Sequence, residues 1–344
     1  MSSNRELSIV ILAAGMGKRM LSKKQKILHE VGGKPMIMHV VDAARRVSIN
    51  PPALVIGPIG GEEVKRLVGP EALYVVQPEA LGTGHAARVA TDLLQGKSSQ
   101  VIVTYGDMPL LRQETLENLS QIQAETEAAV VMTTVIGEPT STFGRIIRND
   151  DGRVTGIVEY ANAKKMENGD ELIAIRELNV GVYCFDADFL WKNLPELPLR
   201  HARSGVEYYL TDMVEIAVSQ GRLVEAAVIS DDDESLGAGT RAELVEVEKA
   251  FRRRANRRWL SAGITLIDPD SIFIDQDVTI GQDTIIWPNS YIQGKTTIGN
   301  DCVIGPNTII RDAELGDRVV AEQCSIENQQ VASDQRLLPF THLT

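Results

Sequence analysis

Residues 274–310 read IDQDVTIGQDTIIWPNSYIQGKTTIGNDCVIGPNTII, a stretch in which isoleucine recurs at every sixth position. The recurring residues are Ile274, Ile280, Ile286, Ile292, Ile298, Ile304 and Ile310. Four positions after each of the first six stands a small or β-branched residue: Val278, Thr284, Ser290, Thr296, Cys302 and Thr308. This period is typical of a left-handed parallel β-helix, in which three hexapeptides form one triangular coil. We expect each isoleucine to point inward and each small residue to lie near a corner.

The period breaks after Ile310, because Leu315 follows after five residues and later positions such as Glu322 and Glu327 are polar. We therefore expect a short β-helix over residues 263–330 and a tail over 331–344. A short stack with open ends needs a cap or self-association. This predicts a homo-oligomer, with a trimer favoured.

A helical pattern precedes the repeats, and it predicts a connecting helix over residues 241–262. Its apolar residues fall at spacings of three and four on one face: Leu244, Val247, Phe251, Ala255 and Trp259. The opposite face carries several arginines, among them Arg253 and Arg257. We interpret them as a solvated face, and a contact with an anion or a nucleic acid is the alternative.

Short apolar runs alternate with helical patterns through the first two-thirds of the chain. The strands are expected at 7–13, 53–57, 73–76, 101–105 and 128–136, and the helices at 34–47, 61–68, 84–94 and 113–125. Such alternation predicts a parallel sheet covered on both faces. Residues 142–182 are rich in β-formers and glycine, which indicates an inserted antiparallel lobe. The expected fold is α/β: a doubly wound, Rossmann-like domain over residues 1–240, followed by the β-helix.

Composition excludes several classes of protein. The chain has 344 residues, of which 43% are hydrophobic and 24% charged, and it has no apolar run long enough to span a membrane. Its start, MSSNREL, is polar, the apolar run behind it is too short for a signal peptide, and its three cysteines form no CxxC motif. We expect a cytoplasmic protein that does not bind membranes.

The charge is distributed unevenly. The chain carries a formal charge of -12, which argues against nucleic-acid binding, yet residues 1–46 hold nine Lys or Arg against three acids. A basic segment in an acidic protein predicts a local site for a small anion.

A glycine-rich turn follows the first expected strand: Leu12, Ala13, Ala14, Gly15, Met16, Gly17, Lys18, Arg19 and Met20. Backbone N–H groups of such a turn can contact phosphate oxygens, and the cations add positive charge. A Walker loop would need glycine at position 12 and Ser or Thr after Lys18, and the dinucleotide fingerprint would need a small residue at position 20. The pattern LAAGxGxRM followed by Lys26 resembles the signature loop of sugar-1-phosphate nucleotidyltransferases.

Asp107 comes directly after the strand VIVTY and Gly106. An aspartate at the carboxyl edge of a parallel sheet is well placed to hold Mg²⁺ opposite a phosphate loop, and Gly106 would let a ligand approach the backbone. A helix N-cap is the structural alternative for Asp107.

A third motif, QPEALGTGHA at residues 77–86, again follows a strand and opens a helix. The Gln77 amide can pair with a base edge, and Gly82 and Thr83 can present backbone groups to the same base. His85 could be a general base, but phosphoryl-type transfer rarely requires one, so we expect it to pack at the start of the helix.

Together these motifs resemble the bacterial family of bifunctional N-acetylglucosamine-1-phosphate uridyltransferase/glucosamine-1-phosphate acetyltransferases, over residues 7–260 and into the first coils. Phe143–Ile146, Ile157–Glu159 and Glu177–Gly181 resemble that family's sugar-binding segments, and residues 207–212 match a stretch that we assign to structure. The resemblance implies transfer of a uridylyl group from UTP to N-acetylglucosamine 1-phosphate, giving UDP-N-acetylglucosamine and pyrophosphate for cell-wall precursor synthesis.

The resemblance also implies a set of contacts. Leu12, Ala13, Ala14, Gly15 and Lys26 would meet the nucleotide phosphates, Gln77, Gly82 and Thr83 the uracil, and Tyr105, Gly144, Glu159 and Asn179 the sugar. Asp107 would hold Mg²⁺, while Arg19 and Lys26 would offset charge during catalysis.

Two departures from the family pattern qualify these expectations. The family has an asparagine as second metal ligand where this chain has Gly239, so water, phosphate oxygens, Thr240 or residues 231–233 would have to complete the metal sphere. The sequence ends about where the acetyltransferase half would begin, so no acetyl-CoA site can be assigned.

Two other functions stay open at this point. One is a related sugar-1-phosphate nucleotidyltransferase that uses dTTP or glucose 1-phosphate. The other is a non-catalytic regulatory subunit of the same fold, which Gly239 favours and which Arg19, Lys26 and Asp107 argue against.

Overall fold

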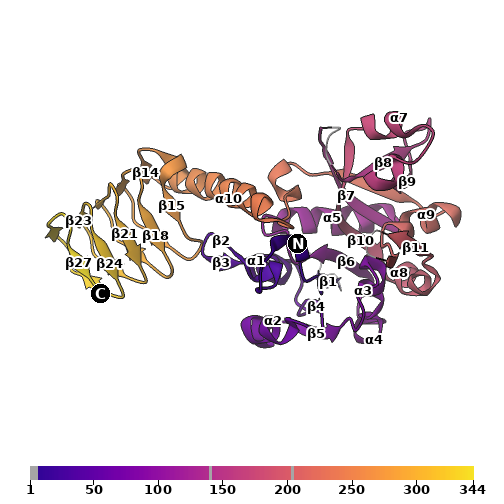
Figure 1. The fold of residues 1–344 in the computed structure, drawn as a ribbon, viewed down its shortest axis with the longest axis horizontal. Helices are drawn as coiled ribbons and strands as arrows, with labels where there is room; N and C mark the ends of the chain where they lie inside the picture. Colours follow the sequence, from indigo (N-terminus) through magenta and orange to yellow (C-terminus); the bar gives the residue numbers. More distant parts are fainter. Residues whose placement is uncertain (1–6, 139–141, 203–204) are drawn as a thin grey trace. The chain divides into compact units, whose positions relative to one another are not determined.

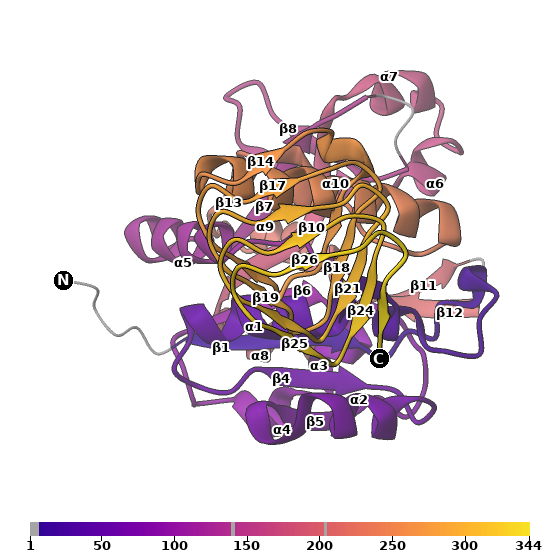
Figure 2. The same ribbon diagram turned by 90° about the vertical axis from the view of Figure 1, so that its left-hand side faces the viewer.

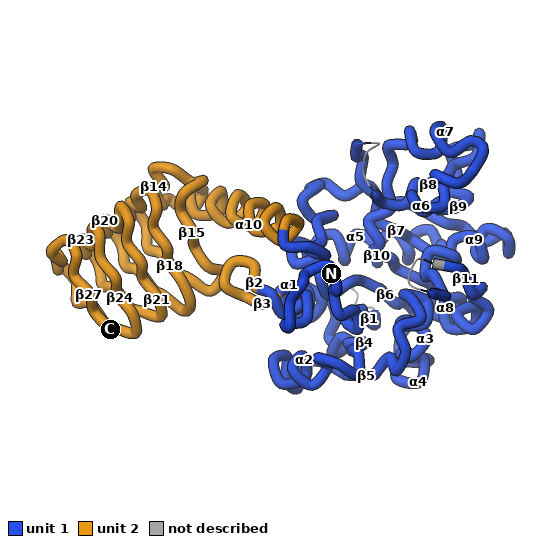
Figure 3. The backbone as a smooth tube through the Cα atoms, viewed as in Figure 1, with its two compact units in different colours: residues 1–29, 36–241 blue, residues 30–35, 242–344 orange. Residues whose placement is uncertain are grey.

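The computed structural model describes residues 7–138, 142–202 and 205–344, so the polar start of the chain lies outside the described residues. Contacts between residues divide the chain into two compact units (Figure 3). Unit 1 comprises residues 1–29 and 36–241, and unit 2 comprises residues 30–35 and 242–344. Across the described ranges, no helix combines the length and the apolar composition that crossing a membrane requires.

Unit 1 is built on a nine-stranded sheet whose main path runs β13-β7-β10-β6-β1-β4-β5 (Figure 1). Its strands are β1 (Leu7–Ala13), β4 (Ala53–Ile56), β5 (Leu73–Val76), β6 (Gln100–Tyr105), β7 (Val130–Ile136), β8 (Gly144–Arg148), β9 (Val154–Val158), β10 (Glu177–Asp186) and β13 (Val224–Val228). A separate hairpin joins β11 (Leu199–Ala202) to β12 (Gly205–Tyr208). All five strands expected from the sequence are present.

The sheet is mixed and not wholly parallel. Strand β1 pairs in parallel with β4 and β6, whereas β10 runs antiparallel to both β6 and β7. The hairpin of β8 and β9 pairs with β10, so the expected antiparallel lobe is an extension of the main sheet. The expectation of a parallel sheet therefore holds for the five strands found from the sequence and fails at β10, which lies between two of them.

Helices cover both faces of this sheet, as the sequence predicted. They are α1 (Met36–Val47), α2 (Gly61–Val68), α3 (Thr83–Arg88), α4 (Thr91–Leu94), α5 (Gln113–Thr126), α6 (Tyr160–Ala163), α7 (Gly169–Ala174), α8 (Ala187–Asn193) and α9 (Asp212–Ser219). One apolar cluster contains Val40 of α1 and Leu116 of α5, and a second contains Leu190 of α8 and Met213 of α9. The single helix expected over 84–94 is divided into α3 and α4.

Unit 2 is a β-helix of three parallel sheets, preceded by α10 (Arg241–Ser261); Figure 2 shows the coils nearly end-on. Its strands are β14 (Thr265–Leu266), β15 (Phe273–Ile274), β16 (Thr279–Ile280), β17 (Ile285–Ile286), β18 (Tyr291–Gln293), β19 (Thr297–Ile298), β20 (Val303–Ile304), β21 (Ile309–Arg311), β22 (Glu314–Leu315), β23 (Val320–Ala321), β24 (Ser325–Glu327), β25 (Gln330–Val331), β26 (Arg336–Leu337) and β27 (His342–Leu343). Ile274 pairs with Ile292, and Ile292 with Ile310, so paired residues lie three hexapeptides apart.

The repeat positions fill the inside of the coil. Ile286, Ile292, Ile304 and Ile310 are fully buried, and Ile280 is partly buried. The small residues are buried as well, and their hydroxyls find backbone partners: Thr284 Oγ1 donates to the Gly299 carbonyl at 2.9 Å. Short side chains are required there because a larger group would displace the next coil.

The β-helix extends further than the broken hexapeptide period indicated. Strand β26 pairs with β23, and β27 pairs with β24, so residues expected to form a tail belong to the coil. Leu315, Ala321, Ile326 and Val331 keep the interior apolar across turns of unequal length. Cys302 is an interior residue, as expected, and is fully buried.

The hairpin of β2 (Glu30–Val31) and β3 (Lys34–Pro35) belongs to unit 2, which the sequence did not predict. The Gly32 N–H donates to Glu248 Oε2 of α10 at 2.9 Å, and the Gln276 N–H donates to the Gly32 carbonyl at 2.9 Å. These bonds attach the hairpin to the start of the coil.

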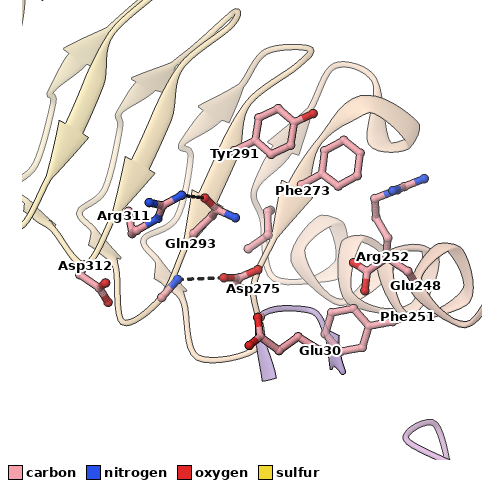
Figure 4. A pocket seen from close by; sticks show the side chains of 13 residues that line it. Glu30, Glu248, Phe251, Arg252, Phe273, Asp275, Tyr291, Gln293, Arg311 and Asp312 are labelled. Atoms are coloured by element: carbon pink, nitrogen blue, oxygen red, sulfur yellow. Dashed lines mark hydrogen bonds between the residues drawn. The ribbon is translucent and has the colours of Figure 1, made fainter. Parts of the chain in front are cut away.

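A cavity of about 430 Å³ lies beside this hairpin within unit 2 (Figure 4). One side is aromatic, since Phe273 stacks on Tyr291 and the Arg252 guanidinium lies 4.4 Å from the Phe273 ring centre. The other side carries Glu248 and Asp275, and burial raises the pKa of both carboxyls. Arg252 and Tyr291 are therefore both neighbours of the Phe273 ring in this cavity.

Gly33 makes the hairpin sensitive to substitution. Its φ is +73°, and a Cβ there would lie 2.2 Å from Asp275 Oδ2. We expect Gly33→Ala to lower the free energy of unfolding by about 1–3 kcal/mol, because backbone strain and displacement of Asp275 add together. Gly263→Ala is the matched control in the same unit, since its φ is +88° and the nearest atom is 3.9 Å away. Denaturant unfolding of both variants measures the difference, and equal losses would contradict the packing argument.

Candidate functional site

The three motifs expected to bind ligand meet at one cavity of about 290 Å³ in unit 1. Strands β1 and β6 are parallel neighbours, and β4 and β5 continue the parallel path, so their carboxyl ends share one edge of the sheet. The motifs follow β1, β5 and β6 directly. The residues that line the cavity are Leu12, Ala13, Ala14, Gly15, Lys26, Ile27, Gln77, Ala80, Gly82, Thr83, Ala86, Tyr105, Asp107 and Glu207.

The glycine turn is shaped around Lys26. Gly17 has φ +70°, and a Cβ on it would lie 2.5 Å from the Cβ of Lys26, so any side chain at position 17 would displace the lysine stem. Gln25 Nε2 donates to the Ala13 carbonyl at 2.8 Å and to the Gly15 carbonyl at 3.2 Å. The buried Gln25 therefore joins the turn to the short helix that carries Lys26, a role that no sequence motif indicated.

Lys26 and Asp107 form an ion pair in the cavity, through Nζ and Oδ2. Both side chains stay partly exposed. The glycine-rich turn and the acid at the tip of β6 thus line the same cavity, which is the arrangement that the sequence predicted. Arg19 lies differently: it is exposed, in the short 3-10 helix Lys18–Met20, and is not among the residues that line the cavity.

Strand β12 closes the side of the cavity formed by Gly82 and Thr83. Gly82 has φ +91°, and a Cβ on it would meet the Tyr208 carbonyl oxygen at 2.6 Å. The Leu210 N–H donates to Thr83 Oγ1 at 3.0 Å. Glu207, which the sequence analysis assigned to structure, lines the cavity from this strand.

The residues expected to hold the sugar gather at a second cluster. A Cβ on Gly144 would lie 3.6 Å from Asn179 Cβ and 3.7 Å from Glu159 Cδ, so these three residues are neighbours. None of the three lines the cavity itself. Tyr105 connects the two places, because a Cβ on Gly181 would lie 2.8 Å from its ring and the Gly181 N–H donates to Asn179 Oδ1 at 3.1 Å.

Burial sets the protonation of the groups around Tyr105. It raises the pKa of the Tyr105 hydroxyl well above its usual value, and the carboxylates of Glu159 and Asp107 raise it further. Burial also raises the pKa of the Glu159 carboxyl. Tyr105 is therefore a neutral hydrogen-bonding group, which contacts Thr83, and not a base.

Gly106 packs closely against its neighbours. It is buried, its N–H donates to the Leu12 carbonyl at 3.0 Å, and a Cβ on it would meet Ile37 Cδ1 at 2.8 Å. The absent side chain leaves room for Ile37 of α1, so packing accounts for glycine here, and the approach of a ligand to this backbone stays a prediction.

Asp107 is the carboxylate expected to hold a metal, and Glu207 is the other carboxylate in the cavity lining. Among the described residues, no group of three or more His, Cys, Asp or Glu is arranged to hold a metal ion. The Ala238 N–H donates to the Asp107 carbonyl at 3.3 Å, so the segment that contains Gly239 lies beside Asp107 without a side chain at that position. Asp231 Oδ1 caps a short turn by accepting from the Asp233 N–H at 3.2 Å.

Comparisons with known proteins are consistent with both units. Residues 9–170 match the family model of the MobA-like NTP transferase domain, and residues 277–312 match the bacterial transferase hexapeptide model of six repeats. The bifunctional protein GlmU of Exiguobacterium sibiricum is 40% identical over 334 residues, covering 97% of this chain and 73% of that protein. The same-named protein of Bacillus subtilis is 39% identical, covering 97% and 72%. The chain belongs to the GlmU family.

GlmU membership decides the reaction. The chain is a UDP-N-acetylglucosamine diphosphorylase, which carries out the GlmU uridyltransferase reaction of UDP-N-acetylglucosamine synthesis. Its substrates are a nucleotide and a sugar phosphate, and nucleotidyltransferases of the GlmU family generally use a divalent metal.

A solved structure supports the fold alone. A putative glucose-1-phosphate thymidylyltransferase from Bacillus anthracis, in complex with a sucrose, superposes with a TM-score of 0.57 at 19% identity. The superposition covers 72% of this chain and 95% of the other.

Proposed function

We propose that the cavity of unit 1 aligns UTP and N-acetylglucosamine 1-phosphate for direct uridylyl transfer. An oxygen of the sugar phosphate forms a bond to the α-phosphorus while the bond from that phosphorus to the bridging oxygen breaks and pyrophosphate leaves. No covalent intermediate is needed, because the attacking oxygen is already anionic. The observation that carries this proposal is the meeting of Lys26 and Asp107 in the cavity that Gln77 and Gly82 also line.

The residues of the glycine turn hold the nucleotide phosphates. Backbone groups of Leu12, Ala13, Ala14 and Gly15 contact phosphate oxygens, as is usual where a strand leads into a glycine-rich turn. The Lys26 ammonium offsets negative charge that develops between the α-phosphate and the leaving pyrophosphate. Arg19, exposed on the same turn, contacts the outer phosphates of the bound nucleotide.

The remaining residues select the base and the sugar. Gln77, Gly82 and Thr83 contact the uracil, while Tyr105, Gly144, Glu159 and Asn179 contact the acetamido sugar. Tyr105 suits a place between the base-binding residues and the sugar cluster. It forms a hydrogen bond with Thr83, and its ring lies against Gly181, which is next to the sugar cluster.

Mg²⁺ is the divalent metal that fits these residues best. The Asp107 carboxylate matches an ion that keeps several waters and otherwise binds substrate phosphates. When bound, the ion neutralises phosphate charge and orients the two phosphates. Gly239 has no side chain to act as a ligand, so water, phosphate oxygens, Thr240 or residues 231–233 would complete the metal sphere.

We infer further that the protein is a cytoplasmic homotrimer. The β-helix leaves several large apolar side chains exposed, including Trp287, Tyr291 and Ile309, which self-association would cover.

Pyrophosphate release tests the proposed specificity. We expect turnover with UTP and N-acetylglucosamine 1-phosphate to exceed turnover with dTTP or with glucose 1-phosphate by at least about 10-fold, since each change leaves a polar contact unmade. Equal rates with glucose 1-phosphate would contradict the assignment of Glu159 and Asn179 to the acetamido group. Equal rates with dTTP would contradict the assignment of the base.

A further inference from the structure

The amide of Gln77 can adopt one orientation in the cavity wall. Its Nε2 lies 3.1 Å from the Gly82 carbonyl oxygen and 3.1 Å from Nδ1 of His85. A carbonyl only accepts hydrogen bonds, so the NH₂ group and not the oxygen must face Gly82. Gln77 is 5% exposed, and its Oε1 has no hydrogen-bond donor within the part of the chain that the structure describes. Oε1 is therefore the atom left to meet a ligand in the cavity that Gln77 lines.

His85 supplies the second acceptor that this orientation requires. The Gln77 NH₂ has two hydrogens, one for Gly82 and one for Nδ1 of His85, and Nδ1 can accept only if the imidazole is neutral and protonated on Nε2. Burial lowers the pKa of His85, and nearby Arg88 lowers it further, which favours the neutral ring. The position of the Gln77 amide therefore depends on which nitrogen of the buried His85 ring carries the hydrogen.

A competing contact shows that the two partners of Nδ1 exclude each other. Nδ1 also lies 3.1 Å from the Glu79 carbonyl oxygen, to which it can donate only when it carries a hydrogen. In that state Nδ1 no longer accepts from Gln77, and the amide keeps only its bond to Gly82. His85 does not line the cavity, so it acts on a bound base only through Gln77.

We propose that His85 is a positioning residue that holds the Gln77 carbonyl oxygen toward the base and so selects uracil over cytosine. Uracil presents an N–H donor at N3, whereas cytosine presents an acceptor there, and an accepting Oε1 pairs with the first and opposes the second. The inference rests on the proposed function, which places the uracil at Gln77.

The test compares kcat/KM for UTP and for CTP, with N-acetylglucosamine 1-phosphate as the second substrate. We expect His85→Phe, which keeps a ring but removes the acceptor, to lower the UTP-to-CTP ratio roughly 3- to 10-fold, the worth of one hydrogen bond. His85→Asn places an amide oxygen near Nδ1 and is expected to restore most of the ratio. If His85→Phe does not fold, His85→Leu takes its place. A purely structural role would lower both rates together and leave the ratio unchanged, which would overturn the proposal.

A double-mutant cycle separates this inference from the proposed function. Gln77→Leu removes the amide, so it is expected to lower the ratio by itself, and His85→Phe is then expected to have no further effect. Independent, multiplying effects of the two substitutions would overturn the role of His85 while leaving Gln77 as the base contact. An unchanged ratio in Gln77→Leu would instead overturn the placement of the base, and an inactive wild-type protein would overturn the proposed function.

Discussion

Replacing Lys26 by alanine is expected to lower kcat for pyrophosphate release by about 10²- to 10³-fold, while KM for the sugar phosphate changes far less. The ammonium group lies in the cavity and already contacts the Asp107 carboxylate, so it needs little rearrangement to meet the phosphates. Removing it takes away a positive charge that stabilises the transition state. It also leaves the Asp107 carboxylate without its Lys26 partner, close to an anionic substrate.

Lys23→Ala is the matched control for this experiment. Lys23 is exposed in the same segment and does not line the cavity, so its loss changes the net charge equally and is expected to leave kcat within about twofold. Initial rates of pyrophosphate release measure both variants. Wild-type kcat in Lys26→Ala would show that the cavity is not the place of the chemistry.

The grouping of the three motifs at one cavity could be predicted from sequence because each motif begins where a strand ends. In a parallel sheet, the residues after β1, β5 and β6 must come to one edge, so Leu12–Gly15, Gln77 and Asp107 could be grouped without coordinates. Gln25 and Glu207 could not be found in this way. Gln25 acts through side-chain bonds to a neighbouring turn, and Glu207 arrives on a separate hairpin whose partner the sequence does not specify.

In the fold, too, elements with a local sequence pattern were predicted, whereas elements that depend on long-range pairing were missed. A fixed period of six identifies the coil because every isoleucine meets the same interior. The period alone could not show that Leu337 and Leu343 continue the coil, since turns of five residues shift the register while the interior stays apolar. The reversed direction of β10 depends on pairing such as Tyr183 with Val103, for which no local pattern exists.

Gly106 and the hairpin at residues 30–35 both make packing contacts that the sequence alone did not reveal. Glycine beside Asp107 was interpreted as room for a ligand, and the structure adds that its missing Cβ leaves space for Ile37. The hairpin carries no motif, and its attachment to Glu248 joins segments more than two hundred residues apart.

Asp107→Asn is the second substitution for which we expect a large effect: a fall in kcat of about 10²-fold and a rise in the Mg²⁺ concentration that gives half-maximal rate. The change keeps the shape of the side chain and removes its charge. Among the described residues no group of three or more His, Cys, Asp or Glu is arranged to hold a metal, so no such cluster offsets the loss of the Asp107 charge. Asp151→Asn, at an exposed turn, controls for the loss of one negative charge.

Gly239→Asn tests the same metal site by gain of function. The segment at 237–239 lies against the backbone of Asp107, so a carboxamide at position 239 starts close to the proposed ion. We expect this variant to lower the Mg²⁺ concentration for half-maximal rate by about 10-fold, the lower end of what one supporting contact contributes. Titrating Mg²⁺ against the rate of pyrophosphate release measures both variants. If Asp107→Asn leaves the Mg²⁺ dependence unchanged, Asp107 is not the metal ligand. If Asp107→Asn changes it but Gly239→Asn does not, an asparagine at position 239 does not reach the ion.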